Sequence, residues 1–423
     1  MANSVPTCAQ PTASENIAII GAGIAGLALA LNLHARGIRS HIFEAAPSLR
    51  EMGVGITLLP HAVRELTALG LTERIAAQAI ENRESAVFNR FGQRIYEEPR
   101  GKFAGYPYPE FGIHRGKLHM TLYEAVRERL GPNAVLCDMR CIGHEQDEEG
   151  VTLSFQRNDG TLAPAIRAMA VVACDGINSA IRKAHYPHET VQFTGINTWR
   201  GVTRMKPILD GRTYMRVGSI RTGKIVIYPI VDNIEGSDNQ LVNWMAEIET
   251  GGEGANDWNK AVGSEGVLPL FRDWHFDWLD VPEMIRNADA IFEYPMVDKD
   301  PIDRWTFGRV TFAGDAAHPM YPRGSNGSAQ ALIDARTLAD FLSKISDPRQ
   351  AFLAYEEARR EITANVVRTN RSNPPDIINM RVEELTGDKP FDNLEDFIER
   401  GELKALSDNY KRIAGFSLQD LAR

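Results

Sequence analysis

A nearly uninterrupted apolar run close to the amino terminus is the feature that most restricts how this chain can fold. Residues 17–33 read IAIIGAGIAGLALALNL, and three of them are glycines in the spacing GxGxxG. A membrane span needs about 20 apolar residues and would not place glycines at a turn-like spacing. The run instead predicts a buried β-strand, a tight glycine turn and the start of a helix.

The residues that follow complete a β-α-β unit. Residues 16–20, 27–36 and 40–44 have the patterns of a strand, a helix and a second strand. Glu44 ends the second strand, 23 residues after Gly21, where an acid can bind the ribose hydroxyls of an adenosine. Because an acid at this position disfavours a 2′-phosphate, the unit is predicted to bind FAD or NAD rather than NADP.

Each small residue of the glycine turn has a predicted part in binding a dinucleotide. Gly21 allows the tight turn, Gly23 lets a pyrophosphate approach the backbone, and Gly26 lets the helix pack closely on the strand. Ile24 and Ala25 open the helix, whose free N–H groups and dipole attract phosphates.

Two further motifs stand where a strand meets a helix. Residues 174–182 read CDGINSAIR, and residues 314–327 read GDAAHPMYPRGSNG after a strand-like stretch at 309–313. Asp175 and Asp315 at these strand ends can accept hydrogen bonds from the hydroxyls of a ligand. A glycine-rich loop before a helix can offer N–H groups to a negatively charged ring edge. Each aspartate–glycine pair alone is common in turns, so the combination carries the prediction.

In this order and spacing the three motifs resemble those of the class A flavoprotein monooxygenases. These are single-component aromatic hydroxylases, such as p-hydroxybenzoate hydroxylase and salicylate hydroxylase. The resemblance covers about residues 16–372, and Cys174 and Ser325 depart from the residues usual in the family, Ala or Gly and a second Gly. Five other segments are similar to the phenazine-pigment hydroxylases in particular: 53–56 (GVGI), 114–118 (HRGKL), 199–202 (WRGV), 294–298 (YPMVD) and 320–322 (MYP).

The resemblance implies an α/β fold of the p-hydroxybenzoate hydroxylase type. A Rossmann-type FAD/NAD(P)-binding domain is interrupted by an antiparallel β-sheet substrate domain and followed by a helical C-terminus. Alternating apolar runs between residues 192 and 294 agree with an antiparallel sheet. The expected division is residues 15–82, 112–190 and 292–345 for FAD binding, 83–111 and 191–291 for the substrate domain, and 346–423 for the helical segment.

The resemblance also implies the chemistry. Non-covalently bound FAD, reduced by NADH or NADPH as a transient co-substrate, reacts with O2 to form a flavin C4a-hydroperoxide. This species would hydroxylate a small electron-rich aromatic or N-heteroaromatic substrate. Arg115 would contact the ribityl-phosphate region, Asp315 the ribityl chain, and Asp175 both FAD and NAD(P)H. The remaining expected cofactor contacts are Gly55, Gly314, Pro322, Gly324, Ser325, Asn326 and Gly327, the last four facing the flavin pyrimidine edge.

The substrate pocket is expected between the β-sheet domain and the flavin. The candidate wall residues are Tyr321, Trp199, Tyr228, Met245 and Phe292, with Arg200 or Arg204 as the anchor for a carboxylate. An aromatic residue or a methionine on a sheet is more often core than pocket. His318 is expected to be structural or on the cofactor side. Arg323 is either a solvated charge or a phosphate contact.

Composition excludes several other classes of protein. The 47 basic and 56 acidic residues leave a net charge of −9, which disfavours a nucleic-acid partner. No Cys/His cluster has metal-ligand spacing, so no metal site is predicted. The four cysteines form no CxxC pair, which favours a reduced, cytoplasmic protein. No integral membrane contact is expected, and the protein is expected to be a monomer or a homodimer. The charged segment 394–404 is expected to present a solvated face, with a dimer contact as the alternative.

Two other functions are compatible with the same motifs. A flavin-dependent reductase, dehydrogenase or oxidase would share the fold but add no oxygen to its substrate. A non-catalytic FAD-binding or partner-binding protein would retain the cofactor without being reduced by a nicotinamide. Stimulation of NAD(P)H consumption by an aromatic compound, with oxygen in the product, distinguishes the monooxygenase from both.

Overall fold

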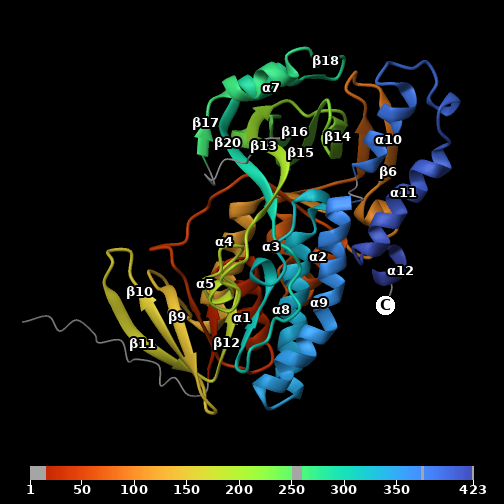
Figure 1. The fold of residues 1–423 in the computed structure, drawn as a ribbon. Helices are drawn as coiled ribbons and strands as arrows, with labels where there is room; N and C mark the ends of the chain where they lie inside the picture. Colours follow the sequence, from red (N-terminus) through yellow and green to blue (C-terminus); the bar gives the residue numbers. More distant parts are fainter. Residues whose placement is uncertain (1–15, 250–259, 373–375, 422–423) are drawn as a thin grey trace, which may run out of the picture.

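The structure, a computed structural model, describes residues 16–249, 260–372 and 376–421. Figure 1 shows a parallel sheet wrapped by helices in the lower half of the molecule and a larger, mainly antiparallel sheet above it. The last helices of the chain, in blue, run along one side of both parts.

The lower part is built on a five-stranded parallel sheet with the order β21-β12-β1-β2-β8. Strands β1 and β12 (IAII and AVVA) are fully buried, as expected for parallel strands covered on both faces. The predicted β-α-β unit is confirmed as β1, α1 and β2. The strands are β1 (Ile17–Ile20), β2 (Ser40–Phe43), β8 (Val135–Leu136), β12 (Ala170–Ala173) and β21 (Val310–Phe312).

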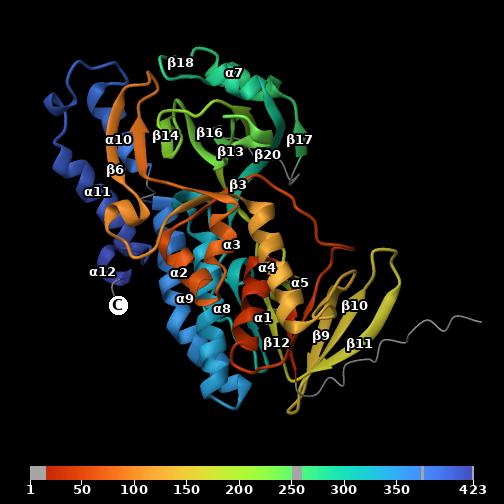
Figure 2. The ribbon, with the colours of Figure 1, turned by 180° about the vertical axis from the view of Figure 1, so that it is seen from behind.

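Long helices cover this sheet. Helix α1 packs against α4 and α8, and α8 packs against α9. A separate three-stranded antiparallel sheet extends from the same part of the molecule (Figure 2). The helices are α1 (Ile24–His34), α2 (Pro60–Ala68), α4 (Arg115–Leu130), α5 (Ala180–His185), α8 (Gly327–Lys344) and α9 (Pro348–Ser372). The three strands are β9 (Arg140–Gln146), β10 (Val151–Gln156) and β11 (Leu162–Ala168).

The upper part is an eight-stranded sheet with the order β17-β20-β13-β16-β15-β14-β5-β6. All neighbours are antiparallel except β14 and β5. Strand β20 continues to Asp298, so the sheet extends beyond residue 291, the boundary expected from sequence. The strands are β5 (Glu84–Phe88), β6 (Arg94–Pro99), β13 (Gln192–Met205), β14 (Thr213–Ser219), β15 (Gly223–Val231), β16 (Gln240–Glu249), β17 (Lys260–Val262) and β20 (Ala288–Asp298).

The two faces of the eight-stranded sheet differ in chemistry. One face is apolar and packs against α6 (Leu268–Phe271) and α7 (Val281–Arg286). The other face, which we call the inner face, carries the half-buried Arg200 and the buried polar and aromatic side chains Tyr214, Arg216, Lys224, Tyr228 and Glu247 among apolar ones. The small sheet of β3 (Gly55–Leu58), β4 (Ala79–Glu81) and β7 (Phe111–His114) lies next to β15, on the path between the two parts.

The C-terminal helices do not form a separate unit. Helix α9 packs on α8, and α10 (Ile377–Thr386) and α11 (Arg400–Ile413) pack beside β5 and β6 (Figure 1). Helix α11 exposes many charged residues, as its sequence predicts, but it buries Leu403 and Tyr410.

Three cysteines, Cys137, Cys141 and Cys174, are free thiols, and Cys8 lies outside the described residues. Within the described ranges, no helix combines the length and apolar character needed to cross a bilayer. The same ranges contain no group of three His, Cys, Asp or Glu side chains arranged to hold a metal ion.

Candidate active site

The three motifs meet at the carboxyl edge of the parallel sheet. Gly21 has a φ of +102°, and a Cβ added there would lie 2.5 Å from the carbonyl oxygen of Cys174. A Cβ added at Gly314 would lie 2.8 Å from the Cβ of Ala25. The glycine turn therefore touches both other motifs, although they are about 150 and 290 residues away along the chain.

The glycine turn leaves room for a pyrophosphate. A Cβ added at Gly26 would come within 2.0 Å of the carbonyl oxygen of Gly21, whereas a Cβ at Gly23 would meet nothing within 4 Å. Gly23 is also the N-cap residue of α1, and it provides no side chain to hydrogen-bond the first N–H groups of that helix. Open space and unsatisfied N–H groups together fit a phosphate group.

Glu44 is fixed beside this turn. Its Oε2 accepts a hydrogen bond from the backbone N–H of Ala22 at 2.8 Å, and its Oε1 accepts one from Ala46 at 2.8 Å. The carboxylate of Glu44 thus has a defined orientation at the end of β2, as a ribose-binding acid requires.

The two motif aspartates lie at neighbouring strand ends. Loss of hydration raises the pKa of Asp315, while nearby His318 and Arg115 lower it. Burial also raises the pKa of Asp175, whose Oδ2 accepts a hydrogen bond from Ala180 N at 3.0 Å. Arg115 is exposed as the first residue of α4. Asp315, also exposed in spite of its dense surroundings, is placed to meet a ligand.

The loop before α8 has a left-handed backbone at two successive residues. Gly324 has a φ of +74° and Ser325 a φ of +56°, within the short 3-10 turn η6 (Arg323–Ser325). Ser325 therefore adopts a conformation that favours glycine, the residue that the family resemblance predicts at this position. We call residues 321–327 the flavin loop.

Gly55 is fixed from the other side of the site. Its N–H donates to Asn243 Oδ1 at 2.7 Å, and a Cβ on Gly55 would lie 2.6 Å from the Cβ of Asn243. Close packing between β3 and β16 thus accounts for the glycine, and its contact with the cofactor stays a prediction.

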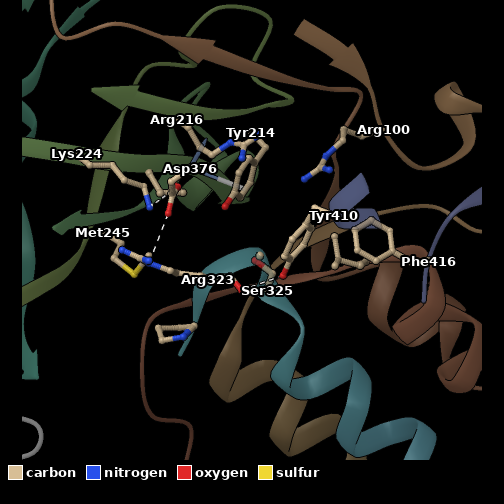
Figure 3. Close-up of a pocket in the computed structure, with 14 residues that line it drawn as sticks. Arg100, Tyr214, Arg216, Lys224, Met245, Arg323, Ser325, Asp376, Tyr410 and Phe416 are labelled. Atoms are coloured by element: carbon tan, nitrogen blue, oxygen red, sulfur yellow. Dashed lines mark hydrogen bonds and ion pairs between the residues drawn. The ribbon is translucent and has the colours of Figure 1, made fainter. Parts of the chain in front are cut away.

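A cavity lies between the flavin loop, the inner face of the large sheet and the C-terminal helices (Figure 3). Its volume is about 40 Å³, space for a few water molecules. The residues that line it are Leu59, Arg100, Tyr214, Arg216, Lys224, Val226, Met245, Pro322, Arg323, Gly324, Ser325, Asp376, Tyr410 and Phe416.

Buried charges are paired across this cavity. Lys224 Nζ lies 2.7 Å from Glu247 Oε2 and 2.7 Å from Asp376 Oδ1. Arg323 Nε lies 3.6 Å from the other oxygen of Asp376, so Lys224 and Arg323 approach this carboxylate from the sheet and from the loop (Figure 3). Burial would raise the pKa of Asp376, but the two cations lower it below its usual value. Arg323, which the sequence left open, is therefore a buried ion-pair partner.

The structure places some of the predicted pocket residues on the inner face and others elsewhere. Met245 lines the cavity, and Arg200, Tyr228 and Phe292 lie on the same inner face. Trp199 does not lie on the inner face. Its neighbour Arg200 lies there, and adjacent residues of a strand point to opposite faces. Trp199 packs instead in the apolar core under α6 and α7.

Two other candidates lie away from the cavity. Tyr321 is buried in a small apolar cluster with Ile196, Ile220 and Met296, although it belongs to the flavin loop. Arg204 is exposed and forms ion pairs with Glu235 at 3.0 Å and Asp289 at 3.1 Å. This leaves Arg200 as the candidate carboxylate anchor.

Arg200 is a half-buried cation whose Nε is fully buried. Among the described residues, no carboxylate lies within ion-pair distance of its guanidinium, and its Nε has no hydrogen-bond partner. The guanidinium carbon lies 5.3 Å from the ring centre of Tyr294. Burial lowers the pKa of Arg200.

His318 has a structural position. Its Nε2 lies 2.5 Å from Asp334 Oδ2 in the buried interior, and Arg359 Nε donates to the other oxygen of Asp334 at 2.8 Å. Asp334 Oδ2 also accepts from the N–H of Gly314 at 3.1 Å. The pair thus supports the strand end that carries Asp315.

Several cavity residues were missed by the sequence analysis: Arg100, Tyr214, Arg216, Lys224, Asp376, Tyr410 and Phe416. For Tyr214, Arg216 and Lys224 a signal existed, since polar or aromatic residues alternate with apolar ones along β14 and β15. For Asp376 and Tyr410, on the C-terminal helices, we find no local signal.

Comparison with known proteins identifies the family. The model of the FAD binding domain family matches residues 15–249 and 290–370. Phenazine 1,6-dicarboxylic acid hydroxylase of Lysobacter antibioticus is 41% identical over 362 residues, which cover 84% of this chain and 89% of that protein. 3-Amino-4-hydroxybenzoate 2-monooxygenase of Streptomyces platensis is 34% identical over 370 residues, covering 84% and 86%.

Solved structures confirm the predicted fold class. A substrate complex of salicylate hydroxylase superposes with a TM-score of 0.73 at 22% identity, covering 97% of this chain and 98% of that one. The predicted FAD cofactor agrees with the family model, and the resemblance seen in the three motifs is confirmed. The chain belongs to the FAD binding domain family and, within it, to the flavoprotein monooxygenases that hydroxylate aromatic compounds.

Proposed function

We propose that this monooxygenase hydroxylates an electron-rich aromatic or N-heteroaromatic compound that carries a carboxylate. The observation that supports this substrate class is Arg200, a half-buried guanidinium on the inner face whose buried Nε has no hydrogen-bond partner and which has no ion-pair partner in the described ranges. A buried cation is stabilised by a bound anion. Both curated relatives named above carry an aromatic carboxylic acid in their names.

We assign the cofactor contacts as the motifs predict. The turn at Gly21, Gly23 and Gly26 would hold the pyrophosphate, Glu44 the adenosine ribose, and Asp315 the ribityl chain. Open space at Gly23 and the fixed carboxylate of Glu44 support these roles. When bound and reduced, FAD supplies the activation of O2, and NADH or NADPH supplies the electrons.

The protein's own residues would position the substrate and exclude water. Arg200 binds its carboxylate, and Met245 and Val226 provide apolar walls. Lys224 is paired with Glu247 and Asp376, whereas no carboxylate of the described residues lies within ion-pair distance of Arg200, whose guanidinium is therefore available to an anion. An aromatic ring is larger than this cavity, so its binding requires movement of the cavity walls.

The test uses Arg200→Gln and a matched control, Arg204→Gln, on the same strand. With a panel of carboxylated phenols, quinolines and phenazines, we expect wild type to add one oxygen atom to at least one compound and consume NADH or NADPH. In Arg200→Gln, KM for the carboxylated compound should rise at least about tenfold, because a charge-assisted hydrogen bond is lost. Arg204→Gln should change KM less than about twofold, since its ion pairs lie in solvent.

The other functions give different results. Flavin reduction at one rate with every aromatic compound, and without oxygen in any product, would favour the reductase or oxidase. A flavin reduced by neither nicotinamide would favour the non-catalytic protein. An equal rise of KM in both variants would refute the role of Arg200 while leaving the monooxygenase intact.

We also propose that the protein works in the cytoplasm as a monomer or homodimer. The free thiols of Cys137, Cys141 and Cys174 are compatible with a reducing compartment. Size-exclusion chromatography with light scattering decides between the two oligomeric states.

A further inference from the structure

Three buried side chains form a hydrogen-bonded cluster behind the flavin loop. They are Asn326, which belongs to the loop and is the N-cap residue of α8, Asn370 on α9 and Tyr410 on α11, and we call them the clasp. Asn326 Nδ2 donates to Tyr410 Oη at 2.9 Å, and Tyr410 Oη donates to Asn370 Oδ1 at 3.0 Å. A single phenol hydroxyl thus joins the two amides.

The clasp binds three backbone carbonyls of the loop. Asn370 Nδ2 donates to the carbonyl of Tyr321 at 3.2 Å, and Asn326 Nδ2 donates to that of Gly324 at 3.2 Å. Tyr410 Oη lies within hydrogen-bond distance of the carbonyl of Arg323, at 3.3 Å. In a trans peptide the C=O of one residue and the N–H of the next point in opposite directions. Holding the carbonyls of Arg323 and Gly324 toward the helices therefore turns the N–H groups of Gly324 and Ser325 away from them.

The shape of the loop depends on the same hydroxyl. A Cβ added at Gly324 would lie 1.9 Å from Tyr410 Oη, so Tyr410 occupies the space that a side chain would need. The left-handed conformation of Ser325 costs about 1 kcal/mol or more in a non-glycine residue and persists only where surrounding contacts enforce it. The clasp provides such contacts on both sides of Ser325.

We propose that Tyr410 is a positioning residue for the flavin. With Asn326 and Asn370 it orients the peptide units at residues 323–325 so that their N–H groups face the negatively charged edge of the flavin ring. Helix α11 is then part of the active site, although it lies in the C-terminal segment outside the family match, which ends at residue 370. The inference rests on the proposed placement of the flavin at this loop.

The test compares Tyr410→Phe with Tyr106→Phe. Tyr106 is buried in the same apolar cluster, and its hydroxyl donates to the carbonyl of Phe416 at 2.8 Å, outside the loop. Each variant loses one buried hydroxyl, and Tyr410→Phe should lose more thermal stability, because it leaves the amides of Asn326 and Asn370 without their common partner. Only Tyr410→Phe should weaken FAD binding, by about five- to tenfold in a fluorescence titration, and shift the flavin absorption bands.

Two further measurements make the result independent of catalysis. Hydrogen exchange of residues 321–327 in the FAD-free protein should accelerate in Tyr410→Phe but not in Tyr106→Phe. Asn370→Ser, which breaks the clasp from α9, should reproduce the Tyr410→Phe pattern. Equal FAD affinity and equal exchange in Tyr410→Phe and Tyr106→Phe would refute the positioning role. Accelerated exchange in Tyr410→Phe with unchanged FAD affinity and spectrum would mean that the clasp holds the loop but that the flavin is not placed there, which refutes the proposed placement instead.

Discussion

The two faces of the eight-stranded sheet are made by alternate residues of the same strands, yet they differ completely. On the apolar face, Ile225, Ile227 and Trp244 pack under two short helices. On the inner face, Lys224 and Glu247 are as deeply buried but charged. Burial of ions is costly unless they are paired, so the inner face gains function rather than stability from its charges.

The largest loss of stability is expected from breaking the ion pairs of the inner face. Lys224→Met leaves the carboxylates of Glu247 and Asp376 buried without their common partner. We expect the free energy of unfolding to fall by about 3–5 kcal/mol, measured by urea denaturation.

The control is Lys206→Met, which removes an exposed lysine paired with Asp238 on the surface. It should change stability by less than about 0.5 kcal/mol. If the two variants lost the same stability, the charges of the inner face would be solvated rather than buried.

A second buried charge network lies under the nucleotide site and gives a pH-dependent effect. Burial would raise the pKa of Asp334, but His318 and Arg359 hold it at about 2. Because an unfolded aspartate titrates near 3.9, the lowered pKa contributes about 2 kcal/mol of stability. The contribution is complete above about pH 5 and is lost as the pH falls through 4 toward 2.

The measurement compares wild type with Asp334→Asn at several pH values. The stability difference between them should shrink by about 2 kcal/mol between pH 5 and pH 2. Asp147, also with a pKa of about 2, pairs with Arg167 on the surface, and Asp147→Asn should show a smaller change because water screens the pair. A pH-independent difference for Asp334→Asn would contradict the assignment.

The nucleotide site and the cavity also differ in how far the sequence could predict them. The glycine turn, Glu44 and the two motif aspartates are local: each follows a strand directly, and parallel strands bring their carboxyl ends to one edge. The lower part of the molecule and its three motifs were therefore predictable from short segments.

The cavity is not local. Whether an alternating polar face meets water or a buried cavity depends on what covers it, and here Asp376 and Tyr410 arrive from about 150 to 200 residues downstream of Lys224 and Tyr214. The alternation of side chains along a strand could still have excluded Trp199 from the predicted pocket, once its neighbour Arg200 was assigned to the inner face.

The smallest effect distinguishes the two faces at adjacent residues of β15. Ile227→Val removes one methylene from the apolar face and should cost about 1 kcal/mol of stability with no change in KM. Val226→Ala, one residue earlier, shortens a side chain that lines the cavity on the inner face. The cavity becomes larger, and KM for the aromatic substrate should change. Steady-state kinetics and urea denaturation of both variants decide the matter. Because residues 226 and 227 share one backbone, a change in KM confined to Val226→Ala can arise only from the face to which its side chain points. A similar change of KM in both variants would mean that substrate binding responds to the strand as a whole. The inference that only the inner face binds substrate would then be wrong.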